Sequence, residues 1–327
     1  MMKKSLVPIL VLAILGIGAC AASPPATSSA DGSDEGDREL KRGIYWYQKG
    51  CNCKAIEHFL AAHEHYSLTD QQAGVARSLN SIANGYRHAG KAEDARLFYD
   101  AAIAAARRCD DQRVMAQALC NKVAILIEAD DLAGAEVLLD EAQLLTRETG
   151  QAYAMVLNHR AVLLMMANRT DEAVTLLDQA DAAAVGDGFN ADATIRFTRG
   201  RLMMKNGNYA EAMSLFQHAL ELDRQAGFTR GMADDLSAMA GIQEQLGEDE
   251  AALDCLDRSL KIHALLENRA KVLENLGRLE SLAQKTRTDV RVTVHFVNQW
   301  LAGEAVDVIC RQCQRYSGVA PVLPCRG

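Results

Sequence analysis

An alanine-centred amphipathic pattern recurs six times along this chain, and its near-constant spacing is what most limits the fold. The alanines are Ala55, Ala95, Ala135, Ala173, Ala212 and Ala252, and the successive steps are 40, 40, 38, 39 and 40 residues. A fixed period of this length is typical of a solenoid, in which each unit buries its apolar face only by stacking on its neighbours. The pattern therefore predicts a repeat scaffold of the kind that binds other molecules.

Each alanine is followed on the same helical face by a large residue and then a small one. The residue four positions later is large and apolar: Phe59, Tyr99, Leu139, Leu177, Phe216 and Leu256. The residue seven positions later is small: Ala62, Ala102, Ala142, Ala180, Ala219 and Ser259. Offsets of 4 and 7 share one face of a helix, and small residues let two helices approach closely. These segments are expected to be the second helix of each unit.

A glycine stands five residues before the alanine in most units, where a positive φ would end a preceding helix. The glycines are Gly50, Gly90, Gly207 and Gly247. The third and fourth units have Asp130 and the pair Asn168–Arg169 there instead, so we expect less regular turns in those two units. Each unit is thus predicted to be a helix, a short turn and a second helix.

A further small or slim residue lies twelve positions before each alanine, and a larger one follows it after three. The first set is Gly43, Ala83, Val123, Ala161, Gly200 and Ala240, and the second is Trp46, Tyr86, Leu126, Leu164, Met203 and Gln243. With these positions the chain resembles the tetratricopeptide repeat family, in its elongated form with units of about 40 residues. The fifth unit matches best, with Gly200, Met203, Gly207, Tyr209, Ala212, Phe216 and Ala219.

The resemblance covers about Asp37–Ser259 and implies an all-α, right-handed superhelical solenoid of helix-turn-helix repeats. We expect this solenoid to occupy residues 38–285, including a capping helix over Asn268–Ala283, with a short cysteine-containing C-terminal extension at 286–327. A heptad bundle would also give alanine-rich amphipathic helices, but its pattern would not restart every 40 residues.

The N-terminal residues 1–19 have the features of a lipoprotein signal peptide. Lys3 and Lys4 precede a 12-residue apolar run from Leu6 to Ile17, which is too short for a permanent membrane helix but suits a secretory signal. The run ends Ile17-Gly18-Ala19-Cys20, which resembles the bacterial lipobox. The resemblance implies lipidation of Cys20, whereas the alternative is an ordinary signal peptide with an incidental cysteine.

The expected location is the bacterial cell envelope, with the protein facing the periplasm and held by its N-terminal lipid alone. Ala21 follows the cysteine, and in enterobacteria a residue other than aspartate there favours transfer to the outer membrane. Residues 20–37 are rich in Ser, Pro, Gly and Asp and are expected to be a flexible tether. Loss of the signal peptide would take the formal net charge from −8 to −10, which argues against nucleic acid as a partner.

The chain lacks the sequence motifs of the common catalytic and metal sites. It has no phosphate-binding glycine loop, no nucleophile elbow and no His-Glu-x-x-His motif. Cys51, Cys53, His58, His63 and His65 are the nearest thing to a zinc cluster, but His58 and His63 would diverge on a helix. We therefore expect no metal site, no cofactor and no enzymatic activity.

Three of the remaining cysteines crowd into the C-terminal extension. Cys120 and Cys255 lie in repeat helices and are expected to be core residues, whereas Cys310, Cys313 and Cys325 are disulfide candidates in an exported protein. The odd number leaves one thiol free or paired with Cys51 or Cys53. A redox role for Cys310-x-x-Cys313 is the alternative, although nothing upstream resembles a thioredoxin fold.

The extension itself shows two further patterns. Polar and apolar residues alternate from Arg291 to Val297, which predicts a short strand, and Trp300–Ile309 is expected to be a helix.

The resemblance also suggests where a ligand would bind. In the family, the first helix of each unit lines a concave groove, with positions 2, 5, 9 and 12 pointing into it. Asparagine can pair with a peptide backbone of any sequence, and arginine can hold a carboxylate. The corresponding residues here are Arg77, Asn80, Asn84, Arg87, Asn158 and Arg201, with Asn121 one residue away from that stripe.

The leading hypothesis is therefore a lipid-anchored periplasmic adaptor that captures a peptide or protein for an envelope assembly. A structural subunit that oligomerises through the ends of the solenoid is the second possibility. A redox or metal protein built on the cysteine-rich extension is the third.

Overall fold

The computed structural model describes residues 29–149, 152–184 and 189–301, and these residues form fourteen α-helices without a strand. None of the helices in these segments is long and apolar enough to cross a membrane. The helices are α1 (Ser29–Gln48), α2 (Asn52–Leu68), α3 (Gln72–His88), α4 (Ala92–Arg108), α5 (Gln112–Glu128), α6 (Leu132–Thr149), α7 (Tyr153–Met166), α8 (Thr170–Ala183), α9 (Phe189–Lys205), α10 (Tyr209–Ala226), α11 (Thr229–Leu246), α12 (Asp249–Leu265), α13 (Arg269–Thr286) and α14 (Arg291–Leu301).

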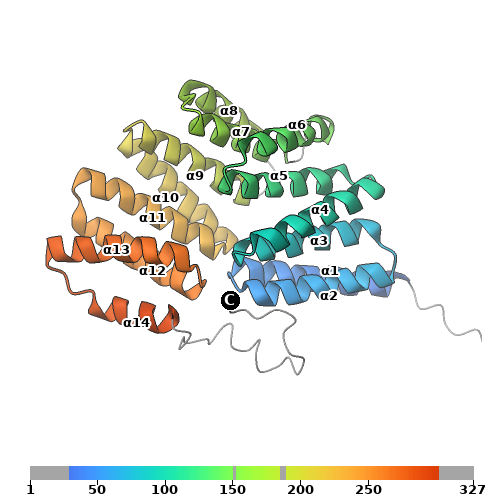
Figure 1. Cartoon of the computed structure of the whole chain (residues 1–327), viewed down its shortest axis with the longest axis horizontal. Helices are drawn as coiled ribbons and strands as arrows, with labels where there is room; N and C mark the ends of the chain where they lie inside the picture. Colours follow the sequence, from blue (N-terminus) through green and yellow to red (C-terminus); the bar gives the residue numbers. More distant parts are fainter. Residues whose placement is uncertain (1–28, 150–151, 185–188, 302–327) are drawn as a thin grey trace, which may run out of the picture.

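Successive helices pair as hairpins, and the hairpins stack into a curved array (Figure 1). Each odd-numbered helix from α1 to α9 also contacts the next odd-numbered helix, up to α11. The odd-numbered helices therefore form an inner layer, and the even-numbered helices α2 to α12 lie outside it. This arrangement confirms the all-α solenoid expected from the sequence.

The core consists of the residues that recur in each unit. All six of the spaced alanines are fully buried, and the large residues that follow them are at most 2% exposed. Where the large residue is phenylalanine, the facing residue on the first helix is glycine: a Cβ on Gly43 would lie 2.4 Å from the Phe59 ring, and one on Gly200 would lie 2.7 Å from the Phe216 ring. The small residues are therefore required by how closely the two helices of a hairpin approach.

The turns between the two helices of a unit share one backbone conformation. Gly50, Gly90, Gly207 and Gly247 have φ of +74° to +79°, as expected. Asp130 and Asn168 in the third and fourth units also adopt a positive φ, of 59° each. The expectation of less regular turns in these units was therefore wrong, because Asp and Asn tolerate the left-handed conformation better than most residues.

The N-terminal boundary of the helical region differs from the expected one. Helix α1 begins at Ser29, so residues 29–37 are helical rather than part of a flexible tether. Asp37 on this helix accepts a hydrogen bond from the buried Tyr66 hydroxyl of α2, and such a tertiary contact can stabilise a polar helix that composition alone would leave unfolded.

The C-terminal region contains a second correction. Helix α13 begins after Asn268, whose side chain accepts a hydrogen bond from the Lys271 backbone N–H, and it agrees with the expected capping helix. Residues Arg291–Val297 form the start of helix α14, not a strand. Val297 is fully buried, so contacts with the solenoid override the local alternation. Of the helix expected over Trp300–Ile309, only Trp300 and Leu301 lie among the described residues.

The seventh hairpin, formed by α13 and α14, is open because the repeat pattern fails there. Glu280 of α13 stands where the earlier units have a small residue, 40 positions after Ala240, so α14 cannot approach α13 as closely. Helix α14 packs mainly on α12 instead. Val292 and Phe296, which correspond to the buried Ala252 and Leu256, are 69% and 40% exposed.

The packing register can be tested at α10. Ala212 is fully buried between the helices of the fifth unit, whereas Ala210 is exposed. We expect Ala212→Leu to lower the free energy of unfolding by about 1–3 kcal/mol through overpacking. Ala210→Leu, the matched control, should change it little. Urea denaturation of both variants provides the measurement, and equal losses would contradict the assigned register.

Candidate functional site

The inner helical layer carries the seven polar residues expected to bind a ligand, and the structure divides them into two groups. Five of them are engaged by neighbouring side chains. Asn121 Nδ2 of α5 donates a hydrogen bond of 3.2 Å to Asn80 Oδ1 of α3. The Arg87 guanidinium of α3 forms an ion pair of 2.6 Å with Glu128 of α5. Asn80 and Asn121 are thus brought together as a contact between repeats.

These contacts follow the period of the repeat. The partners in both pairs are 41 positions apart, so each side chain reaches the next unit at nearly the same height. Ser237 and Arg278 repeat this arrangement between α11 and α13, again 41 positions apart. Such polar cross-links between units are a recurring element of the inner layer, and three of their residues, Asn80, Arg87 and Asn121, were expected to bind a ligand.

Two more of the expected residues contact their own or the preceding unit. Asn84 Oδ1 accepts a hydrogen bond of 2.5 Å from the Tyr99 hydroxyl of α4. Arg77 lies 3.6 Å from the Asp37 carboxylate of α1, and its guanidinium is 5.6 Å from the Tyr66 ring centroid. These bonds stabilise the hairpins and leave Asn84 with only part of its hydrogen-bonding capacity.

Asn158 Oδ1 and the Arg201 guanidinium have no such partner among the described residues. The Asn158 side chain on α7 is buried, and its Oδ1 has no hydrogen-bond partner among the described residues. A buried, unsatisfied amide oxygen is costly, and a donor supplied by a ligand would satisfy it. Arg201 on α9 is exposed, with no ion pair in the part of the chain that the structure describes. Next to Asn158, burial and the charge of Arg87 lower the pKa of His159 to about 4, so this histidine is neutral.

A second polar cluster lies in the core at the junction of the fifth and sixth units. Asp223 at the end of α10 is 5% exposed and Asp235 of α11 is 1% exposed. Neither forms an ion pair with a basic residue among the described residues, and Asp235 Oδ2 has no hydrogen-bond partner there. His263 of α12 is fully buried, with Nε2 at 3.5 Å from Asp234.

The repeat register shows how unusual these residues are. Position by position, Asp235 corresponds to Ser78, Ala118, Val156 and Ile195 in units two to five, all of which are buried. Asp223 and His263 correspond to one another and to Tyr66, Ala106, Thr146 and Ala184, which are also buried. Aligning the units would therefore have revealed acidic residues in core positions, a signal that the sequence analysis missed.

Burial changes the protonation of this cluster. Burial and the charge of Asp234 raise the pKa of Asp223 to about 7. Burial, together with the charges of Asp223 and Asp234, raises the pKa of Asp235 to about 9. At neutral pH, Asp235 is therefore protonated while Asp223 is close to its titration midpoint.

The cysteine and histidine residues near the first turn do not converge. His58 Nδ1 bonds Glu39 at 2.6 Å, His63 Nδ1 lies 3.2 Å from Ser78 Oγ, and His65 is half-buried. In the described segments, no three His, Cys, Asp or Glu side chains form a group that could hold a metal ion. Cys120 and Cys255 are buried in the core, as expected. Cys20, Cys310, Cys313 and Cys325 lie outside the described residues.

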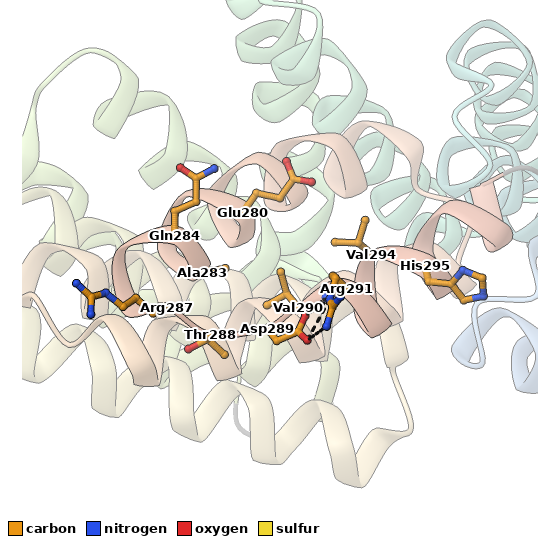
Figure 2. Close-up of a pocket in the computed structure, with 10 residues that line it drawn as sticks. All are labelled: Glu280, Ala283, Gln284, Arg287, Thr288, Asp289, Val290, Arg291, Val294 and His295. Carbon is orange, nitrogen blue, oxygen red and sulfur yellow. Dashed lines mark hydrogen bonds and ion pairs between the residues drawn. The ribbon is translucent and has the colours of Figure 1, made fainter.

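One cavity lies at the C-terminal end of the array. It has a volume of about 710 Å³ and follows from the open packing of α13 and α14 (Figure 2). Its polar side chains include Glu280, Gln284 and Arg287, while Arg291 is held by an ion pair of 2.7 Å with Asp289. A second cavity, of about 630 Å³, lies against α4 and α6, where Lys122 pairs with Asp100.

Family comparisons agree with the repeat geometry. Models of the tetratricopeptide repeat match residues 75–108 and residues 192–264, which lie within α3–α4 and α9–α12. These two segments, about a third of the chain, are recognised as tetratricopeptide repeats. No curated protein matches the sequence significantly.

Several solved structures share this tetratricopeptide-type fold at low sequence identity. A Rap protein complexed with competence and sporulation factor is 16% identical, with a TM-score of 0.54, and the match covers 77% of this chain and 75% of that protein. The Rap conjugation gene regulator of plasmid pLS20, in complex with the Phr* peptide, is 14% identical, with a TM-score of 0.55 and coverage of 86% and 81%. A signal transduction ATPase with a tetratricopeptide repeat sensor from Pyrococcus horikoshii is 13% identical, with a TM-score of 0.54 and coverage of 85% and 44%.

The acidic junction makes stability depend on pH. A carboxyl group whose pKa is raised in the folded protein stabilises the fold below its unfolded pKa, and this stabilisation is lost as pH rises through the folded value. We expect the free energy of unfolding to fall as pH rises from 5 to 9. Each of the two carboxyl groups, Asp223 and Asp235, contributes at most about 1.4 kcal/mol per pH unit to this fall.

Asp235→Asn should flatten this dependence and raise stability at pH 9, because one of the buried carboxylates is removed. Asp254→Asn, at an exposed position on α12, should retain the wild-type slope. Urea denaturation at several pH values gives the comparison. Equal slopes for wild type and Asp235→Asn would show that the junction does not control the pH dependence.

Proposed function

We propose that this chain is an adaptor whose inner helical layer binds an extended peptide or a protein segment. The observation that carries the proposal is the unsatisfied Oδ1 of buried Asn158, on the layer that also presents Arg201. An amide oxygen can accept a hydrogen bond from a peptide N–H of any sequence, and a guanidinium can pair with a carboxylate. The Rap conjugation gene regulator of plasmid pLS20 supports the proposal by analogy, since this protein of similar fold was solved in complex with the Phr* peptide.

We further propose that the adaptor is held by lipid on Cys20 and acts in an envelope assembly, with no catalytic role of its own. This part rests on the N-terminal sequence, from the Lys3–Lys4 pair through the apolar run to Ile17-Gly18-Ala19-Cys20. Stable attachment by lipid requires more than one acyl chain, which the lipobox resemblance would supply. The proposed location is the periplasmic face of the bacterial envelope, at the outer membrane.

A structural subunit that oligomerises through the ends of the array is a second candidate. It is favoured by the exposure of Val292 and Phe296 on α14, because these residues occupy positions that are buried in complete units. A homo-oligomer that leaves the inner layer without ligand would support this alternative.

The ligand-binding surface can be tested with a fluorescent library of short peptides that end in free carboxylates. In the variant with Asn158→Ala and Arg201→Ala, we expect affinity for the peptides that bind to fall at least about tenfold, because a backbone and a carboxylate contact are lost. For the same peptides with amidated C-termini, the loss of affinity from wild type to double variant should be smaller, because an amide offers Arg201 no carboxylate.

Arg107→Gln serves as a matched control for this experiment. Arg107 forms an ion pair of 2.6 Å with Glu141 between outer-layer helices α4 and α6. Its removal should leave peptide affinity unchanged, as should the circular dichroism of every variant. Full binding by the double variant would move the ligand site away from α7 and α9.

Lipid attachment is tested by metabolic labelling with an alkyne fatty acid in a bacterial host. The wild-type protein should be labelled and stay with membranes after a salt wash, and Cys20→Ser should lose both properties. Cys109→Ser, which changes a half-buried cysteine in the repeat region, should retain them. Persistent labelling of Cys20→Ser would refute the proposed anchor.

A further inference from the structure

The curved array closes on itself through a contact between its second and sixth units. Arg230 of α11 donates a hydrogen bond of 3.1 Å from Nη1 to the backbone oxygen of His88 at the end of α3, and these residues are 142 positions apart. Figure 1 shows the corresponding helix ends meeting near the middle of the arc, where α10 and α11 approach α3 and α4. A repeat protein held only by its nearest neighbours would not need this contact.

Aromatic side chains surround the hydrogen bond. The rings of Tyr47 and His88 are stacked with centroids 4.8 Å apart, and the Tyr47 hydroxyl lies 3.1 Å from His88 Nε2. Phe228, from the turn between α10 and α11, has its ring centroid 6.3 Å from Tyr47 and 6.2 Å from His88. We call Tyr47, His88, Phe228 and Arg230 the clasp.

Two neighbouring turns also meet across this closure. A Cβ on Gly50 would lie 1.9 Å from Leu266 Cδ2, so the turn after α1 contacts the turn after α12. A Cβ on Gly227 would lie 3.5 Å from Lys49 Nζ. The closure thus extends over the ends of α1, α3, α10, α11 and α12, although each contact is small.

The clasp lies at the edge of the apolar cores, where Tyr47 packs against the cluster that contains Ala55 and Phe59. One cluster of buried apolar residues extends from Ala154 to Val297, and the two others lie between Ala55 and Leu163. No member of the clasp belongs to the buried set of any cluster. Breaking the clasp therefore would not expose a core, and both halves of the array would keep their own packing.

The middle of the array can accommodate the required bending. Helices α6 and α7, and likewise α8 and α9, pack less extensively than the other pairs that join successive units. Both junctions border the fourth unit, which lies on the far side of the arc from the clasp (Figure 1). A small rotation at these junctions would separate His88 from Arg230.

We propose that the clasp is a separable contact that holds the arc closed and limits the entry of peptide to the inner layer. Arg87, one of the residues expected to face a ligand, directly precedes His88 and faces the clasp. The limit on peptide entry rests on the proposed function, whereas closure by the clasp does not. If the open form binds peptide, an equilibrium that favours the closed form lowers the apparent affinity in proportion to the open fraction.

The charge around His88 would make the clasp sensitive to acid. The groups that face it are Tyr47 from α1, Arg87 from its own helix and Arg230 from α11, with Glu128 of α5 paired to Arg87. Burial and the two arginines keep the pKa of His88 well below its usual value. Neutral His88 therefore contributes fully to closure above the ordinary histidine pKa, and this contribution is lost as pH falls through the lowered pKa of His88.

Small-angle X-ray scattering of the whole protein tests closure directly. We expect the variant with Phe228→Ala and Arg230→Gln to have a larger radius of gyration and maximum dimension than the wild type, at unchanged helicity. Arg224→Gln is the matched control, since Arg224 lies in the last turn of helix α10, close to Phe228 in sequence, but pairs with Glu221 on its own helix. Unchanged scattering by the double variant would overturn the clasp, as would a loss of helicity, because the contact would then belong to the core.

The short-peptide library described above tests the effect on binding. Peptides that bind the wild type should bind the clasp variant about tenfold more tightly if the clasp limits entry. Equal peptide affinity of the wild type and the clasp variant would overturn the limit on entry. Whether the clasp closes the arc would then be decided by the scattering experiment alone. Absence of peptide binding by both proteins would refute the proposed function, and the scattering would still decide whether the arc is closed by this contact.

Discussion

The close approach of two helices within each hairpin is the constraint on which the rest of this structure depends. A fully buried alanine on the second helix and a small residue on the first allow this approach, and one large side chain fills the remaining space. The pairing is reciprocal, because Gly43 and Gly200 stand opposite phenylalanine rings that leave no room for a Cβ. Where the rule fails, at Glu280, the hairpin opens and α14 packs against a different helix. Curvature and the inner layer follow from repeating this unit.

This constraint explains why the fold could be predicted from the sequence. The spacing of the alanines identifies six units, and the glycines at the turns locate the ends of their first helices. The misjudged segments were those where tertiary contacts override composition. Residues 29–37 are helical and bonded to Tyr66, and Arg291–Val297 form a helix with Val297 fully buried. Alternation of polar and apolar residues cannot distinguish a strand from a helix whose partner is unknown.

The candidate site was less predictable, because a polar residue on the inner layer can bind either a ligand or the next repeat. Asn80 and Asn121 had the expected chemistry, but the structure shows that they bind each other. Asn158 differs from them only in having no partner for its Oδ1. The clasp residues were missed for another reason: their contact joins positions 142 apart, and the period of the repeat contains no information about where the arc closes.

Helix α11 belongs to two polar contacts, the acidic junction with α10 and the clasp with α3, and these contacts respond to pH in opposite directions. Rising pH ionises Asp223 and Asp235, which share a buried junction without a basic partner among the described residues, and so weakens the packing of α10 on α11. Falling pH favours protonation of His88 beside Arg87 and Arg230, and so weakens the contact between α11 and α3. Helix α11 takes part in both contacts, through Asp235 on one side and Arg230 on the other. The two effects oppose each other as pH changes, and helix α11 is the element that takes part in both.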